Sequence, residues 1–251
     1  MEFTGRAALV TGAGSGIGRA ISLSLAAGDA FVWVSDFDEN AAAGTVHLIE
    51  NAGGRAEAIG LDVRSEPQWE AAFSRCDEAI ERLTTLVNCA GKAATGDTFS
   101  MSLERFRDIM AINAEGTFLG MKHGIPRISG SGGGAVINIS SLAGLRGIAG
   151  MTAYSGSKGA IRMMTKSVAL ECAGLYNGVR VNSVHPGVVD TPAWRAILAD
   201  VDPEVRARDR VPIGVACTPA EVADTVYFLA SDSARHITGT EIVIDGGMTA
   251  G

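Results

Sequence analysis

Short apolar segments alternate with helical patterns along the whole chain, and this alternation is the strongest constraint on its fold. The segments apolar enough to be strands buried on both faces lie at residues 7–10, 31–35, 56–61, 83–88, 135–139, 179–184 and 241–244. A helical pattern between successive strands implies parallel strands joined by crossover helices. The sequence therefore predicts an α/β fold, a doubly wound parallel sheet of about seven strands with helices on both faces.

Two predicted helix starts have the sequence pattern of a capping box. In this motif two residues three positions apart each accept, through their side chains, a hydrogen bond from the backbone N–H of the other. One pairs Ser65 with Gln68, and the other pairs Thr218 with Glu221. Each is expected to begin a helix. The longest helical patterns lie at residues 103–128 and 154–173.

No linker rich in small or polar residues divides the chain. Its 251 residues are enough for one α/β domain with a sizeable core, so residues 1–251 are expected to form a single domain. A long insertion follows the sixth predicted strand at residues 190–214. It includes Trp194 and is expected to form an amphipathic helical lid over a substrate.

Charge and composition exclude several classes of function. The net charge is −7 and no basic cluster is present, so neither nucleic acid nor an anionic membrane is an expected partner. No apolar run has membrane length and no leader precedes the first strand, which predicts a cytoplasmic protein. The four cysteines and four histidines are scattered, so neither a disulfide framework nor a metal site is expected.

A glycine-rich turn joins the first predicted strand to the first helix. Glycines let backbone N–H groups approach a pyrophosphate, which the start of a helix also attracts. A glycine-rich turn can be merely a tight turn, but its place between a buried strand and an amphipathic helix favours a dinucleotide site. The residues expected to contact the cofactor here are Gly12, Ser15, Gly16, Ile17 and Gly18.

Asp36 ends the second predicted strand and is followed by Phe37. A carboxylate at this point can accept hydrogen bonds from both hydroxyls of an adenosine ribose, and it repels a 2′-phosphate. We therefore expect NAD rather than NADP, with Asp36 and Phe37 in its site.

Tyr154 and Lys158 are one helical turn apart, so both side chains leave the same face of a helix. A phenol with an ordinary pKa near 10 is a poor proton-transfer group at neutral pH, and a nearby cation lowers that pKa. The pair could act as an acid/base. From the spacing alone, an ordinary helix start, with Tyr154 half-buried and Lys158 in water, remains open.

These motifs together resemble the short-chain dehydrogenase/reductase family. Residues 11–18 have its T-G-x-x-x-G-x-G form, and Asn88-Cys89-Ala90-Gly91 is similar to its N-N-A-G segment with Cys89 replacing an asparagine. The resemblance covers essentially the whole chain. It implies a Rossmann-type fold, a homotetramer, and activity like that of the NAD(P)-dependent secondary-alcohol and cyclic-alcohol dehydrogenases.

The resemblance also implies further cofactor contacts. Asp62 and Val63 resemble the family's adenine-binding pair, although a simple turn is an open alternative there. In NADP-preferring relatives a cation commonly stands at the position of Ser15 or Phe37, and this chain has none at either. The other implied contacts are Asn88, Ala90, Gly91, Tyr154, Lys158, Pro186, Gly187, Val189 and Thr191.

In the family the catalytic serine lies thirteen residues before the tyrosine, which selects Ser141 over its neighbour Ser140. The resemblance implies that Tyr154 is the general acid/base and that Lys158 lowers its pKa. Ser141 would hydrogen-bond the substrate oxygen. Asn113 would hold a water that passes protons towards the lysine. No metal is implied.

The expected substrate pocket is mostly apolar and consists of Ala93, Ser141, Leu142, Leu145 and Trp194. Such a pocket suits a small or cyclic secondary alcohol, or its ketone, better than a charged substrate. One alternative is an NADP-linked 3-oxoacyl or steroid ketone reductase, which Asp36 opposes. Another is a catalytically silent NAD-binding scaffold protein, which the presence of both Tyr154 and Lys158 opposes.

Overall fold

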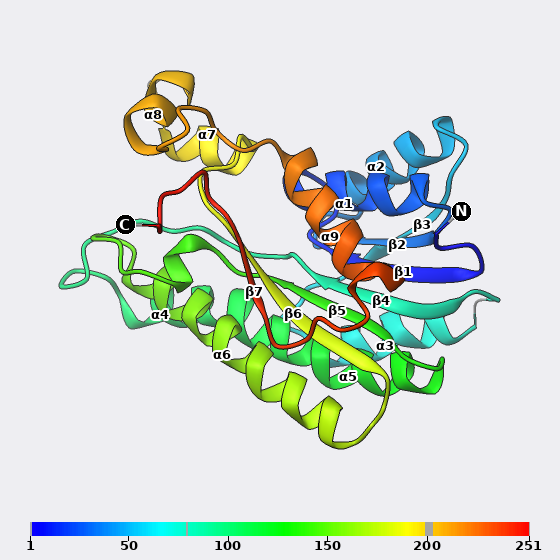
Figure 1. Cartoon of the computed structure of the whole chain (residues 1–251). Coiled ribbons are helices and arrows are strands. Elements are labelled where there is room, and N and C mark those ends of the chain that lie inside the picture. The colour runs from blue at the N-terminus through cyan, green and yellow to red at the C-terminus, as the bar shows by residue number, and fades with distance from the viewer. Residues whose placement is uncertain (1, 79, 199–202, 251) are drawn as a thin grey trace.

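The computed structural model describes residues 2–78, 80–198 and 203–250. Its centre is a seven-stranded sheet in the order β3-β2-β1-β4-β5-β6-β7, and every neighbouring pair of strands is parallel (Figure 1). The strand order reverses direction between β1 and β4, and doubly wound sheets bind ligands at such a point. The strands are β1 (Arg6–Thr11), β2 (Phe31–Asp36), β3 (Arg55–Gly60), β4 (Arg82–Asn88), β5 (Gly134–Ile139), β6 (Val179–Pro186) and β7 (Glu241–Ile244).

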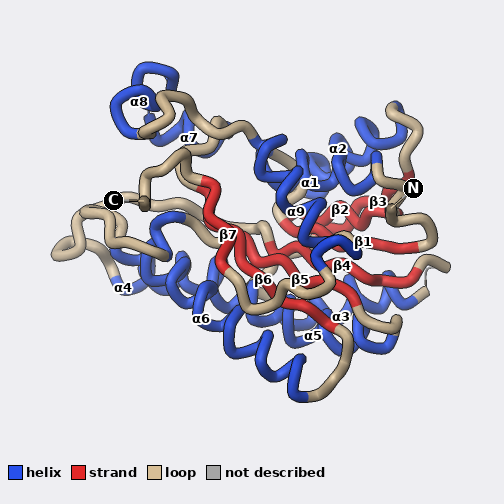
Figure 2. The backbone as a smooth tube through the Cα atoms, in the orientation of Figure 1, coloured by secondary structure: helices blue, strands red, loops and turns tan. Residues whose placement is uncertain are grey.

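Helices cover both faces of the sheet, so the predicted α/β architecture is confirmed (Figure 2). One face carries α1 (Gly16–Ala27), α2 (Glu39–Asn51) and α9 (Pro219–Ala230). The other carries α3 (Glu66–Asp77), α4 (Leu103–Met110), α5 (Gly116–Gly130) and α6 (Thr152–Gly174). Two short helices, α7 (Pro192–Leu198) and α8 (Pro203–Arg210), stand apart beyond the end of β6 (Figure 1). None of the described helices is long and apolar enough to cross a membrane.

Each face of the sheet has its own apolar core, which explains why the strand segments are apolar at consecutive positions. Side chains alternate along a strand, so Leu9 and Val10 point to opposite faces. Val10 belongs to the core under α1 and α9, and Leu9 belongs to the core over α3 and α5. Both are fully buried.

The long helix predicted at residues 103–128 is interrupted. A π-helical turn at Ala111–Glu115 separates α4 from α5, and α5 continues to Gly130. Such turns insert an extra residue and often mark functional sites. The turn contains Asn113, so it places a predicted site residue in the interior.

One of the two predicted capping boxes is wrong. At α9 the Thr218 hydroxyl accepts from the Glu221 N–H, and the Glu221 carboxylate accepts from the Thr218 N–H. At α3 the Ser65 side chain makes no capping bond, although the helix does begin there. The reason is that the Gln68 amide oxygen accepts from the Asp62 N–H at 2.7 Å and so turns away from Ser65.

Candidate active site

A cleft of about 630 Å³ opens at the carboxyl ends of the strands, on the side of the molecule where α7 lies. Every residue predicted to contact the cofactor lines it except Asn88, and so do Ala93, Ser141 and Trp194 from the predicted substrate pocket. Segments from the whole length of the chain therefore meet in one place. The predicted site residues that do not line the cleft are Asn88, Asn113, Leu142 and Leu145.

The floor of the cleft is the glycine loop, which packs against the end of β4. Gly12 has φ +63°, and a Cβ atom there would lie 2.8 Å from the Cα of Ala90, so only glycine fits. The Thr11 hydroxyl accepts from the N–H groups of Cys89 and Ala90, both at 3.0 Å. Sequence reasoning overlooked this role of Thr11, because nothing near Thr11 in the sequence indicates a partner on another strand.

Helix α1 starts at this floor with its first N–H groups available. Ser15 is the N-cap residue, yet its side chain makes no capping hydrogen bond, and the first turn contains no acidic residue. Free N–H groups and the helix dipole favour an anion at such a helix start. The loop therefore suits a pyrophosphate.

Asp36 stands beside the loop. Its carboxylate accepts from the Gly14 N–H at 2.9 Å and from the Asp38 N–H at 3.0 Å, which leaves further acceptor capacity. The nearby cation Arg19 donates to the Gly14 carbonyl and to the Thr45 hydroxyl, so its guanidinium is engaged. The site next to Asp36 thus offers acceptors for hydroxyl groups.

A charged wall that sequence reasoning missed closes one side of the cleft. Arg64 pairs with Asp62 at 2.7 Å and with Asp108 at 3.1 Å, and Lys92 pairs with the same Asp108 at 2.9 Å. The Arg64 guanidinium holds the pKa of Asp62 below its ordinary value. These residues come from three separate segments, and no spacing in the sequence indicates that they meet.

Ser141, Tyr154 and Lys158 come together at the far end of the cleft. The Ser141 hydroxyl lies near the Tyr154 phenol and favours its ionised form. The Lys158 ammonium lies 5.8 Å from the centroid of the Tyr154 ring and donates to the Ile139 carbonyl at 2.8 Å. Because α6 begins at Thr152, Tyr154 and Lys158 both project from its first turns towards the sheet.

Burial dominates the electrostatics of Tyr154 and Lys158. Burial raises the pKa of Tyr154 above its ordinary value, and the nearby Ser141 hydroxyl opposes that shift only in part. Burial also lowers the pKa of Lys158 to about 8. Burial of a charged phenolate is therefore the dominant cost here, and the predicted lowering of the Tyr154 pKa by Lys158 stays a prediction.

The adjacent serines have different partners. The Ser140 hydroxyl donates to the Lys158 carbonyl at 2.9 Å, so its proton is committed to α6. The Ser141 oxygen accepts from the Ala143 N–H at 3.2 Å. Ser141 is therefore the one of the two whose bonding leaves it able to donate to a further oxygen in the cleft.

Asn113 lies behind the cleft wall and is fully buried. Its side chain accepts from the Lys92 N–H at 2.8 Å and donates to the Lys92 carbonyl at 3.1 Å and to the Ser157 hydroxyl at 2.9 Å. It thereby clamps the segment after Gly91 against α6. The predicted water-holding role stays a prediction.

Three other predicted residues lie outside the cleft. The Asn88 amide donates to the Asn138 side chain at 2.8 Å and so ties β4 to β5 inside the core. Its side chain lies on the face of the sheet that α5 covers, with its Oδ1 beside Gly120. Leu142 is buried within a short 3₁₀ turn, and Leu145, which ends that turn, is partly buried.

Thr191, Pro192 and Trp194, from the segment predicted to form a lid, line the cleft. The Thr191 hydroxyl accepts from the Trp194 N–H at 3.2 Å and so begins α7. Trp194 packs against a small buried cluster that includes Val188 and Val211. Residues 199–202, within the predicted lid, lie outside the described residues.

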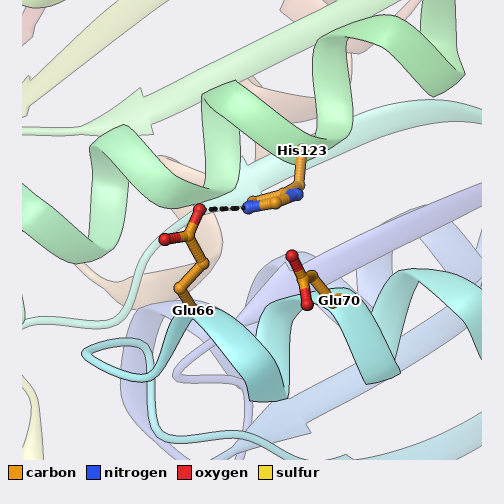
Figure 3. A group of neighbouring side chains, drawn as sticks. All are labelled: Glu66, Glu70 and His123. Atoms are coloured by element: carbon orange, nitrogen blue, oxygen red, sulfur yellow. Dashed lines mark hydrogen bonds and ion pairs between the residues drawn. The ribbon is translucent and has the colours of Figure 1, made fainter.

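One group of side chains could hold a cation, and the sequence gave no sign of it. Glu66 and Glu70 of α3 face His123 of α5, and their ligand atoms lie within 4.8 Å of one another (Figure 3). The His123 Nε2 lies 2.9 Å from Glu66, which also pairs with Lys122. The ammonium of Lys122 already neutralises this carboxylate, so we assign the group to packing between the two helices.

Comparisons with known proteins show the family to which this chain belongs. Residues 12–249 match the family described as enoyl-(acyl carrier protein) reductase. The chain is 41% identical over 252 residues to a 2,5-dichloro-2,5-cyclohexadiene-1,4-diol dehydrogenase of Sphingobium indicum, covering 100% of this chain and 98% of the relative. The chain belongs to the short-chain dehydrogenase/reductase family. The resemblance inferred from its motifs is confirmed.

Other relatives show the range of this family. A cyclopentanol dehydrogenase of a Comamonas species is 39% identical over 243 residues, with 96% of each chain covered. An NADP-dependent (R)-specific alcohol dehydrogenase of Lentilactobacillus kefiri is 36% identical over 253 residues, covering 98% and 97%. A solved structure from Agrobacterium tumefaciens, assigned as a candidate gluconate dehydrogenase, has a TM-score of 0.93 and 30% identity, covering 98% and 97%. Members of the family are oxidoreductases that use a nicotinamide cofactor, NAD or NADP.

Proposed function

We propose that the protein is an NAD-dependent dehydrogenase that interconverts a small or cyclic secondary alcohol and its ketone. The observation that carries this proposal is that Ser141, Tyr154 and Lys158 line the same cleft as the glycine loop. The names of two relatives, a chlorinated cyclohexadienediol dehydrogenase and a cyclopentanol dehydrogenase, support a cyclic alcohol as the substrate.

The proposed cofactor site runs from Asp36 to Lys158. The free N–H groups at the start of α1 would bind the pyrophosphate, and Asp36 would accept from the adenosine ribose. The negative charge of Asp36 disfavours a 2′-phosphate, which supports NAD over NADP. At the other end Lys158 would bind the nicotinamide ribose, and Val189 and Thr191 would bind the carboxamide. When bound, the nicotinamide supplies the hydride acceptor or donor.

The chain's own groups would move the proton. In reduction, Tyr154 gives its phenolic proton to the carbonyl oxygen while Ser141 donates a hydrogen bond to that oxygen. In oxidation, Tyr154 takes the proton of the alcohol and must first be ionised. Because burial raises the pKa of Tyr154, the phenol is protonated near neutral pH, and oxidation should become faster as pH rises.

The test is a panel of cyclic and open-chain secondary alcohols with NAD or NADP, followed by the absorbance of the reduced nicotinamide. We expect turnover with NAD, and Tyr154→Phe should lower kcat/KM by about a hundred- to ten-thousandfold because the general acid/base is lost. Tyr227→Phe is the control, because Tyr227 packs on Phe3 away from the cleft. A preference for NADP would contradict the proposed role of Asp36. Tight NAD binding without turnover on the whole panel would favour a silent scaffold.

We also propose that residues 1–251 act as one unit in which residues 190–214 close over the substrate, and that copies of the chain form a homotetramer. The outer faces of α5 and α6 support the tetramer. Phe118, Met163 and Leu170 are exposed there, and Gly156 and Gly159 leave space for a neighbouring helix. Light scattering on the purified protein tests the oligomeric state. The cytoplasmic location stays a prediction.

A further inference from the structure

A second cavity, of about 410 Å³, lies at the opposite end of the sheet from the cleft. Arg6 begins β1, Arg82 begins β4, and Arg180 is the second residue of β6. All strands of a parallel sheet begin at the same edge, so these three arginines converge although they are far apart in the sequence. Arg235, from the segment before β7, completes the cationic lining.

The cavity is strongly basic in an acidic protein. Asp232 is the one carboxylate among the described residues that line it, and it binds Arg6 through two hydrogen bonds at 3.0 and 2.8 Å. Within the described part of the chain, Arg82, Arg180 and Arg235 form no ion pair of their own. An excess of positive charge is thus gathered here, while the chain as a whole carries −7.

The arginines of this cavity do not use all of their hydrogen-bond donors. The Arg180 Nη2 donates to the Ser231 carbonyl at 3.2 Å, but its Nη1 is buried and has no hydrogen-bond partner. A buried donor without an acceptor is costly, and the cost is larger for a charged group. Arg6 and Arg82 also occupy paired positions on neighbouring strands, where like charges repel. A bound anion would relieve both costs.

We propose that this cavity binds a small anion that carries phosphate groups. A guanidinium presents its N–H groups in a planar fork that matches two phosphate oxygens. The volume is within the range of small-molecule sites, so it accepts an organic phosphate as well as the free ion. The strands of the sheet, about 20 Å long, separate the cavity from the cofactor cleft.

Calorimetric titration of the full-length protein with pyrophosphate at low ionic strength tests the proposal, with AMP and inorganic phosphate as further probes. Arg180→Gln and Arg235→Gln should each weaken pyrophosphate binding about tenfold, because each removes a charge-assisted hydrogen bond. Arg235 is exposed, so its replacement leaves the fold intact even if that of partly buried Arg180 does not.

Two control variants separate this cavity from other sites. Arg55→Gln removes an exposed arginine that begins β3 outside the cavity, and Lys92→Gln removes a cation of the cofactor cleft. Neither should change the affinity for pyrophosphate. The proposal fails if the wild-type protein does not bind pyrophosphate at millimolar concentration, or if the two cavity variants bind it as tightly. It also fails if saturating NAD abolishes pyrophosphate binding or if Lys92→Gln alone weakens it, because the anion then occupies the cleft.

Discussion

The proposed cofactor side of the cleft is fastened to the sheet, whereas the segment that we propose as a lid packs on a small apolar cluster of its own. On the cofactor side, Thr11 joins the ends of β1 and β4, and Asn113 holds both backbone groups of Lys92. On the lid side, Val188, Ala207 and Val211 form a cluster separate from the two main cores.

This difference separates two tasks. A fixed floor presents N–H groups and the Tyr154 phenol at set positions, which would pre-organise them for the proposed cofactor binding and proton transfer. A lid that packs on a small cluster of its own could adapt its inner surface to the substrate at little cost to the fold. The exposed side chains of Ile213 and Val215, on the segment after α8, fit that interpretation. Substitutions on the two sides should therefore have different consequences.

Replacing Trp69 or Trp194 by alanine should give the largest difference in stability between the two sides of the cleft. Trp69 is fully buried, stacks on Phe73 and donates to the Val63 carbonyl at 2.9 Å. Trp69→Ala should lower the free energy of unfolding by about 3–5 kcal/mol, as for other large core residues. Trp194→Ala should lower it by less than about 1 kcal/mol and instead raise KM for the alcohol roughly tenfold.

Urea unfolding and steady-state kinetics on both variants check this contrast. If Trp194→Ala destabilises the protein as much as Trp69→Ala, the lid is part of the main core and the contrast between the two sides is wrong.

Burial of the charged Lys158 side chain should lower the free energy of unfolding, although this side chain belongs to the proposed site. Its pKa is about 8 in the folded protein and 10.5 for the free group, so the unfolded chain holds the proton more tightly. The contribution of Lys158 to the free energy of unfolding is therefore unfavourable below pH 8, rises between pH 8 and 10.5, and vanishes above that window. The full difference corresponds to about 3 kcal/mol.

Lys158→Met should accordingly be more stable than the wild type near neutral pH, by up to about 3 kcal/mol, while losing activity. The gain should shrink as pH rises through the same window. Urea unfolding of both proteins across this pH range measures it. A variant less stable than the wild type near neutral pH would mean that the hydrogen bond to the Ile139 carbonyl outweighs the cost of the buried charge.

The fold was predictable because its signals are local or periodic. Continuous apolar runs such as residues 7–10 predict buried strands, and the alternation with helices predicts parallel crossovers. Tyr154 and Lys158 were found for the same reason, since one helical turn brings them together. The π-helical turn around Asn113 was not found, because it depends on packing against α6 and leaves no pattern in the sequence.

The features of the site that the sequence did not indicate depend on the direction of a side chain or on partners that are distant in the sequence. Asn88 matches a motif of the family, but its side chain points to Asn138 in the core. The wall formed by Arg64, Lys92 and Asp108 needs three segments to meet, which no spacing reveals. The burial that raises the pKa of Tyr154 was not predicted, because the helix spacing indicates a nearby cation but not the extent of burial.

The smallest predicted effect concerns Thr218 and Ser65, two helix N-cap residues on opposite sides of the cleft. Thr218 caps α9. The backbone of the preceding residue, Cys217, hydrogen-bonds the backbone on both sides of Val189. These bonds fix the chain at the far end of the proposed lid segment. Thr218→Ala should lower the free energy of unfolding by about 1 kcal/mol, because it removes a capping hydrogen bond. Ser65→Ala, at the start of α3, removes no such bond and should change it by only a few tenths of a kcal/mol. Urea midpoints of the two variants decide this, and equal losses would show that Ser65 does cap α3 in solution.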